Sequence, residues 1–135
     1  MQGKELTAKE AMEEQSKIIA ALPNKPGEAL KALMKLSGNV TIEQMAERAQ
    51  VSEGTVKNWR KEEYNYDPET VIRIIVGLHL PPWISSWFLQ ICGVGLQFRG
   101  LHMMYRNIIA CHYMDTLGEV NSLIELAGFE KMSES

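Results

Sequence analysis

The chain has 135 residues, of which 45% are hydrophobic, and its formal net charge at pH 7 is −3. This length and composition suffice for a packed domain, and they exclude a chain that is disordered throughout. The negative net charge also excludes a protein that coats nucleic acid through charge alone, because such binding needs a basic surface.

Charge is distributed unevenly along the chain. Residues 1–61 contain ten Lys and Arg against eight Asp and Glu, a net charge of +2, whereas residues 62–135 contain four against nine, a net charge of −5. The first part is therefore better suited to contact phosphate. We expect the acidic second part to face solvent or protein.

Cysteine usage and hydropathy favour a cytoplasmic protein with no membrane partner. The two cysteines, Cys92 and Cys111, are too few for a disulfide framework. The polar first fifteen residues do not resemble a signal peptide. The most apolar stretch, residues 71–101, is interrupted by Arg73 and by two prolines, so it lacks the run of about 20 apolar residues that crosses a membrane.

The N-terminal segment predicts an amphipathic helix that ends near Leu22. Thr7 and Glu10 have the spacing of a capping box, in which each side chain bonds the other residue's backbone N–H. Much of the helix surface is Glu and Lys, which is typical of an arm that is mobile or docked on a partner. By their helical spacing, the residues that we expect to be buried are Met12, Ile18, Ile19 and Leu22.

The rest of the chain predicts seven more helices and no convincing strand. Thr41, Ser52 and Thr116 can each cap a helix with a side-chain oxygen. Asp67-Pro68-Glu69 combines a cap, a proline in the first turn and an acid at the positive end of the helix dipole. We expect these helices near residues 27–37, 42–49, 52–62, 67–78, 81–92, 101–113 and 117–127. The predicted fold class is therefore all-α.

The stretch TIEQMAERAQVSEGTVKNWR, residues 41–60, has the pattern of two short helices joined by a sharp corner. Ala46 is the small residue that such a pair needs where the second helix crosses the first, and Gln50-Val51 is a connection short enough to force the corner. The apolar residues expected in a shared core are Ile42, Met45, Ala49, Val51, Val56 and Trp59. The residues expected on the outer side are Glu53, Gly54, Thr55, Lys57, Asn58, Arg60 and Lys61.

This pattern resembles the lambda-repressor-like (Xre/Cro) helix-turn-helix family over about residues 28–78. The resemblance is carried by Ile42, Met45, Ala46, Val51, Val56 and Trp59 and by the capped helix DPETVIRIIVGL that follows. Gln50 departs from the family, which often has glycine at this corner. The aromatic loop Tyr64-Asn65-Tyr66 and the later Glu119-Val120-Asn121 are similar to bacterial members with a helical C-terminal extension.

The resemblance implies that residues 52–61 form a recognition helix in the major groove of double-stranded DNA. It implies that Thr55 and Asn58 reach base edges, with Ser52 and Lys57 close by. It also implies that phosphates are contacted by Arg60, Lys61 and Lys35, with Arg48 as a further candidate. Because residues 41–61 carry four basic residues against three acidic ones, we expect weak, salt-sensitive binding by a monomer and useful affinity from a dimer.

The same residues have a second interpretation. A three-helix core of this kind is reused as a protein-binding module, and the outer side of residues 52–61 would then be an ordinary solvated surface. Trp59 belongs to the core in either interpretation.

Residues 81–114 are rich in aromatic and methionine side chains at helical spacing. We expect them to form a second small core packed on the first part. Trp87, Met103 and Met104 would also suit a dimer interface, where aromatic residues and methionine are enriched. A ligand pocket is a third interpretation of this segment.

No motif indicates an enzyme. The spacing of His79, His102, His112, Cys92 and Cys111 matches no common zinc pattern. No glycine-rich phosphate loop is followed by a helix pattern, and no nucleophile has a base at recognisable spacing. We predict no catalytic residue, no metal and no cofactor.

Together these patterns predict a lambda-repressor-like helix-turn-helix bundle with an N-terminal helix and a C-terminal helical extension. We expect an N-terminal helix or arm at residues 1–22, a DNA-binding domain at 23–95 and a helical hairpin at 96–135 that mediates homodimerisation. The expected function is sequence-specific DNA binding in transcription regulation. The alternative is a protein-interaction adaptor, antitoxin-like or a mobile-element accessory factor, that retains the fold without binding DNA.

Overall fold

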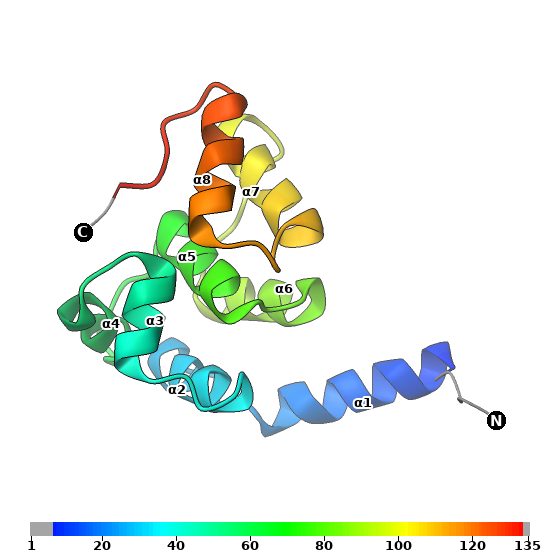
Figure 1. The fold of residues 1–135 in the computed structure, drawn as a ribbon. Helices are drawn as coiled ribbons and strands as arrows, with labels where there is room; N and C mark the ends of the chain where they lie inside the picture. The colour runs from blue at the N-terminus through cyan, green and yellow to red at the C-terminus, as the bar shows by residue number, and fades with distance from the viewer. Residues whose placement is uncertain (1–6, 134–135) are drawn as a thin grey trace.

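The computed structural model describes residues 7–133, and this part of the chain is helical with no strand (Figure 1). The all-α prediction is confirmed. The helices are α1 (Ala8–Ala21), α2 (Pro26–Leu36), α3 (Ile42–Ala49), α4 (Glu53–Trp59), α5 (Pro68–Leu78), α6 (Pro82–Ile91), α7 (Gly100–Cys111) and α8 (Leu117–Leu126). No helix among the described residues is long and apolar enough to span a membrane.

Local side-chain bonds explain where α1, α3, α5 and α8 begin. Complete capping boxes at Thr7, Thr41 and Thr116 start α1, α3 and α8. The Asp67 carboxylate accepts the Thr70 N–H at 2.8 Å and starts α5, with Pro68 in the first turn. These bonds satisfy N–H groups that have no partner inside the helix. The predicted helix starts agree with the structure to within one residue.

Helix α4 is shorter than predicted: it ends at Trp59 and not near Glu62. The hydroxyl of Tyr66 donates to the Trp59 carbonyl, so this carbonyl is satisfied from a later loop and not by a further helical turn. The start of α2 also packs closely on the segment after α4. A Cβ atom on Gly27 would lie 2.7 Å from the carbonyl oxygen of Arg60.

Helix α5 lies at the centre of the fold. Every residue from Thr70 to Leu78 is buried, and α5 contacts α3, α6, α7 and α8. The second small core that we expected beyond residue 81 does not form separately. Tyr105, Ile108 and Ile124 belong to the same apolar cluster as the residues of α2 to α4, because α7 and α8 pack directly on α5.

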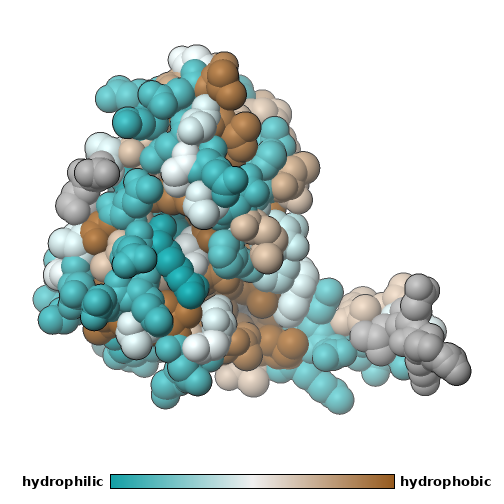
Figure 2. Space-filling model, in the orientation of Figure 1, coloured by the Kyte–Doolittle hydropathy of each residue, from teal (hydrophilic) through white to brown (hydrophobic). Residues whose placement is uncertain are grey.

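Helix α1 is the exception to this packing. It projects from the rest of the molecule and contacts α6 (Figures 1 and 2). The predicted burial of its apolar residues is wrong: no residue of α1 is buried, and Met12 is 61% exposed. Ile18 and Ile19 are half-buried, and Leu22, just after the helix, is partly buried and packs against the core.

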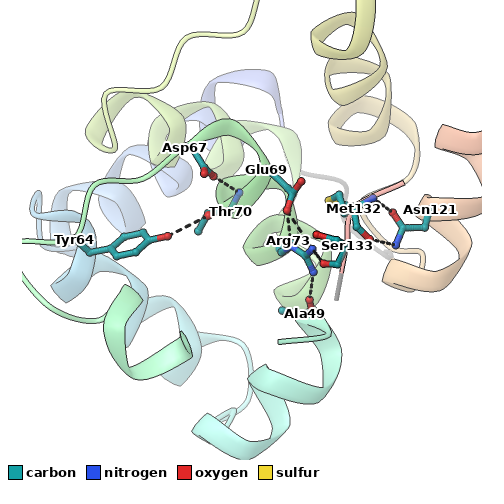
Figure 3. Close-up of polar contacts among 9 residues, drawn as sticks. All are labelled: Ala49, Tyr64, Asp67, Glu69, Thr70, Arg73, Asn121, Met132 and Ser133. Carbon is teal, nitrogen blue, oxygen red and sulfur yellow. Dashed lines mark hydrogen bonds and ion pairs between the residues drawn. The ribbon is translucent and has the colours of Figure 1, made fainter. Parts of the chain in front are cut away.

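A buried arginine connects three segments of the chain (Figure 3). Arg73 is 3% exposed, and its Nη1 donates to the carbonyl of Ala49 at 2.8 Å, where α3 ends. Its Nε and Nη2 donate to one carboxylate oxygen of Glu69 at 3.3 and 3.1 Å, and Nη2 also donates to the carbonyl of Ser133. Arg73 therefore ties the corner between α3 and α4 to α5 and to the C-terminal segment.

The C-terminal segment is held by a second polar contact (Figure 3). The Asn121 side chain accepts the Met132 N–H at 2.9 Å and donates to the Met132 carbonyl at 3.3 Å. Both residues are buried. Asn121, which the sequence placed in the family-like segment after residue 118, therefore has a structural role.

Replacement of Arg73 by methionine should lower the free energy of unfolding by about 3 kcal/mol, because two backbone carbonyls lose their charged donor. Urea denaturation measures this change. The control is Glu69→Gln, which removes the carboxylate charge at a side chain that is 43% exposed and should cost about 1 kcal/mol or less. Equal losses in the two variants would contradict a central role for Arg73.

Replacement of Gly27 by alanine should lower the free energy of unfolding by about 1–3 kcal/mol, because the new Cβ would overlap the Arg60 carbonyl, which is backbone and cannot rotate away. Thermal and urea unfolding measure it. Gly118→Ala is the matched control: its Cβ would meet no atom closer than 3.9 Å, so this variant should be neutral or slightly more stable. A neutral Gly27→Ala would contradict the close contact.

Candidate nucleic-acid interface

Helices α3 and α4 form a tightly packed pair joined by residues 50–52. The core predicted for this pair is confirmed, because Met45, Ala46, Ala49, Val56 and Trp59 are buried. Ile42 and Val51 are partly buried and pack against the same cluster. The apolar side chains of both helices therefore point inward, and the polar side chains of α4 are left outside.

The corner between the two helices is left-handed at a residue that is not glycine. Gln50 has φ 57° and ψ 47°, a conformation that costs an ordinary L-residue about 1–2 kcal/mol. The N–H of Val51 bonds the Ala46 carbonyl at 3.0 Å, which closes α3 in the usual way for a left-handed end. With the Arg73 bond to Ala49, this contact sets the direction in which α4 leaves the corner.

The outer side of residues 52–61 differs in two residues from the prediction, because Thr55 and Arg60 are half-buried. Lys57 and Asn58 are exposed, as are Glu53 and Gly54. Thr55, which was predicted to reach a base edge, is half-buried, and its hydroxyl lies 2.9 Å from the Ser52 hydroxyl. The exposed side chains that can reach a partner from this helix are therefore Glu53, Lys57 and Asn58.

A groove beside α4 carries a second group of basic residues. It has a volume of about 560 Å³ and lies between the end of α2 and the start of α3. Its charged lining residues are Lys31, Lys35, Arg60 and Glu43, and Thr41 lines it at the start of α3. Three cations against one acid, at a helix N-terminus, make this groove favourable for an anion such as a phosphate.

Two of the groove cations have unused hydrogen-bonding capacity. Arg60 Nε is buried and has no hydrogen-bond partner among the described residues. Lys35 is exposed and takes no part in the ion pairs of residues 7–133, whereas Lys31 pairs with Glu28 at 3.2 Å. An oxygen-rich ligand would give both Arg60 and Lys35 a partner.

The structure thus brings together only part of the predicted site. Lys35 and Arg60 share the groove, and Ser52 bonds to Thr55. The predicted residues that do not line the groove are Ser52, Thr55, Lys57, Asn58 and Lys61. Lys31 was not predicted, although it lies one helical turn before Lys35 and so on the same side of α2. Arg48 lies elsewhere, where it donates to the Gly77 carbonyl at 3.4 Å.

The thiols and imidazoles of the described residues do not form a metal-binding group. Burial raises the pKa of the Cys92 thiol to about 12, so it stays protonated at neutral pH. Cys111 is exposed. Between residues 7 and 133, no group of three or more His, Cys, Asp or Glu side chains is placed to hold a metal ion.

Comparison with protein-family models, with curated proteins and with solved structures finds no match to this chain. The case for a function therefore depends on the geometry and charge of α2 to α4.

Replacement of Tyr66 by phenylalanine should lower the free energy of unfolding by about 1–2 kcal/mol, because the Trp59 carbonyl loses its donor at the end of α4. Burial raises the pKa of Tyr66, so its hydroxyl remains a donor at neutral pH. Chemical denaturation measures the loss. Tyr64→Phe, which removes a weaker 3.3 Å contact to Thr70, is the control and should cost less. The role of Tyr66 is contradicted if Tyr64→Phe costs more.

Proposed function

We propose that this chain is a sequence-specific DNA-binding regulator of transcription that acts as a homodimer. In this proposal α3 and α4 are a helix-turn-helix of the lambda-repressor-like kind, and α4 lies in the major groove of double-stranded DNA. The observation that carries the proposal is the basic groove of Lys31, Lys35 and Arg60, which reaches the C-terminal end of α4, a helix whose Lys57 and Asn58 side chains are exposed. A base-reading helix and a phosphate site must lie next to each other, because the groove edges and the backbone are adjacent in a duplex.

The side chains of α4 suit the task of reading bases. Asn58 can form two hydrogen bonds to adenine, and Lys57 can donate to guanine. Glu53 can accept from the amino group of cytosine, although it would repel a nearby phosphate. Gly54 is exposed, and an added Cβ there would meet only the Ser52 hydroxyl, at 3.8 Å, so a partner can approach the backbone closely.

The charge balance explains why the proposal includes a dimer. The chain is acidic as a whole, and the basic side chains are concentrated in residues 1–61. A few phosphate contacts from one copy give weak binding that salt removes easily. Two copies on a palindromic site would double the contacts, with their α4 helices about 34 Å apart, one turn of the duplex.

The first test is selection from random duplex DNA at two salt concentrations, with the wild type and with the Lys57→Ala, Asn58→Ala double variant. An enriched motif that the double variant loses and salt weakens is the expected result, since each bidentate base contact contributes about 1–3 kcal/mol of discrimination. No enrichment at low salt from a folded sample would refute DNA binding. It would favour the protein-interaction adaptor.

A second variant separates phosphate contacts from base contacts. Lys35→Ala should weaken binding to all sequences to a similar degree and reduce the slope of log affinity against log salt by about one. Lys17→Ala, on α1, is the control and should leave both quantities unchanged. A loss of specificity in Lys35→Ala, without a change in slope, would contradict its place at a phosphate.

A further inference from the structure

Helix α1 carries an apolar face that the rest of the molecule covers only in part. At 100° per residue, Ala8, Ala11, Met12, Ile18 and Ile19 fall on one side of the helix, and Lys9, Glu13 and Lys17 fall on the other. No residue of α1 is buried, and no apolar side chain of α1 packs against the core. The face that should be covered in a stable helix is therefore largely exposed, since Ala8 and Met12 are exposed and Ile18 and Ile19 are only half-buried.

A helix of this length needs a surface to pack on. Fourteen residues in isolation are at the limit of helix stability in water, even with good capping. The capping box of Thr7 and Glu10 defines the start of α1, but among residues 7–133 the helix that α1 contacts most is α6. Figure 2 shows hydrophobic residues where α1 joins the rest of the molecule and hydrophilic residues along much of the projecting part.

An apolar groove of about 530 Å³ lies between α6 and α7. Its walls are formed by Ser86 and Leu89 of α6, by Ile109 and Ala110 of α7, and by the connecting residues 94–96, and no residue of α1 lines it. The groove runs along α6, which is about 15 Å long, and α1 is about 21 Å long. The groove therefore offers apolar side chains along α6 and α7 that could pack against the apolar face of a helix such as α1.

The groove and the edge of α1 also have complementary charge. Arg106 lines the groove, and its guanidinium donates to the carbonyls of Leu96 and Gln97. It is not part of any ion pair within residues 7–133. Glu14 lies at the edge of the apolar face of α1, one turn before Ile18, and is likewise in none of these pairs. A helix seated in the groove by this face could place Glu14 at Arg106.

We propose that α1 of one copy occupies the α6–α7 groove of a second copy, and that the exchange is reciprocal. The occupant is a second copy because arm and groove belong to the same chain, and a two-fold exchange covers both faces in both copies. This inference deepens the homodimer of the proposed function and rests on it, but it does not rest on DNA binding. It also gives α7 of the expected dimerisation region a defined role.

Sedimentation equilibrium of the full chain without DNA tests whether α1 contributes to the dimer. Ile18→Glu should raise the dimer Kd roughly thirtyfold or more, because it places a charge on the apolar side that would be buried. Ala20→Glu, on the outer side of the same helix, is the matched control and should leave the Kd unchanged. A dimer with the same Kd in Ile18→Glu, or a wild type that is monomeric at all concentrations, would overturn the proposal.

The contribution of the α6–α7 groove to the dimer is measured in the same way. Circular dichroism confirms that each variant is folded. Ala110→Glu should weaken the dimer, whereas Asn107→Glu, on the same helix but outside the groove, should not. If instead two α1 helices paired with each other, Ala110→Glu would remain fully dimeric, which would overturn the proposal.

A mixing experiment identifies the reciprocal exchange. An equimolar mixture of Ile18→Glu and Ala110→Glu retains one intact arm and one intact groove in each heterodimer, so it should dimerise at concentrations where each variant alone is monomeric. The charge reversals Glu14→Arg and Arg106→Glu should each weaken the dimer, and their combination in one chain should restore it. No heterodimer and no restoration would overturn the exchange.

The outcomes also separate this inference from the proposed function. Variants that stay dimeric and still select a DNA motif would refute the exchange alone. A dimer that responds to the variants as described but selects no DNA would support the exchange and refute DNA binding.

Discussion

The fold depends on one buried guanidinium. Arg73 lies in the centre of α5, and its donors reach the end of α3, a carboxylate on its own helix and the C-terminal segment. A charge in a protein interior is tolerated only when it is paired and hydrogen-bonded, and arginine has enough donors to satisfy several acceptors at once. The bond to the Ala49 carbonyl matters most, because this carbonyl immediately precedes the corner that directs α4.

Helix α4 shows how tertiary contacts maintain a short element. Seven residues cannot form a stable helix alone. Ser52 caps its start, Tyr66 bonds its last carbonyl, and the chain that follows packs on Gly27 of α2. Because these contacts come from several directions, the outer face of α4 has a defined position, and the basic groove reaches the end of the helix at Arg60. A surface that reads a duplex needs this rigidity, which is why the proposed function is assigned here.

Helix α1 is the opposite case. Its start is defined by a capping box, so it is helical for local reasons, but it has no buried residue. Its apolar face, the groove between α6 and α7 and the unpaired charges of Glu14 and Arg106 are consistent with a contact between two copies. That contact would lie on α1, α6 and α7, whereas the proposed DNA surface lies on α2 to α4. The two proposed contacts therefore lie on different helices.

The sequence by itself determined the helices, their starts and the inward residues of α3 and α4, because caps and apolar spacing act within a few residues. Only the tertiary structure decided what covers each face. The amphipathic pattern identified the apolar side of α1. It did not predict that the rest of the molecule leaves this side largely exposed. The end of α4 depends on Tyr66, and the basic groove depends on α2 lying beside the residue after α4. Arg73, which interrupts an apolar run in the sequence, is the centre of the fold because its partners are distant along the chain.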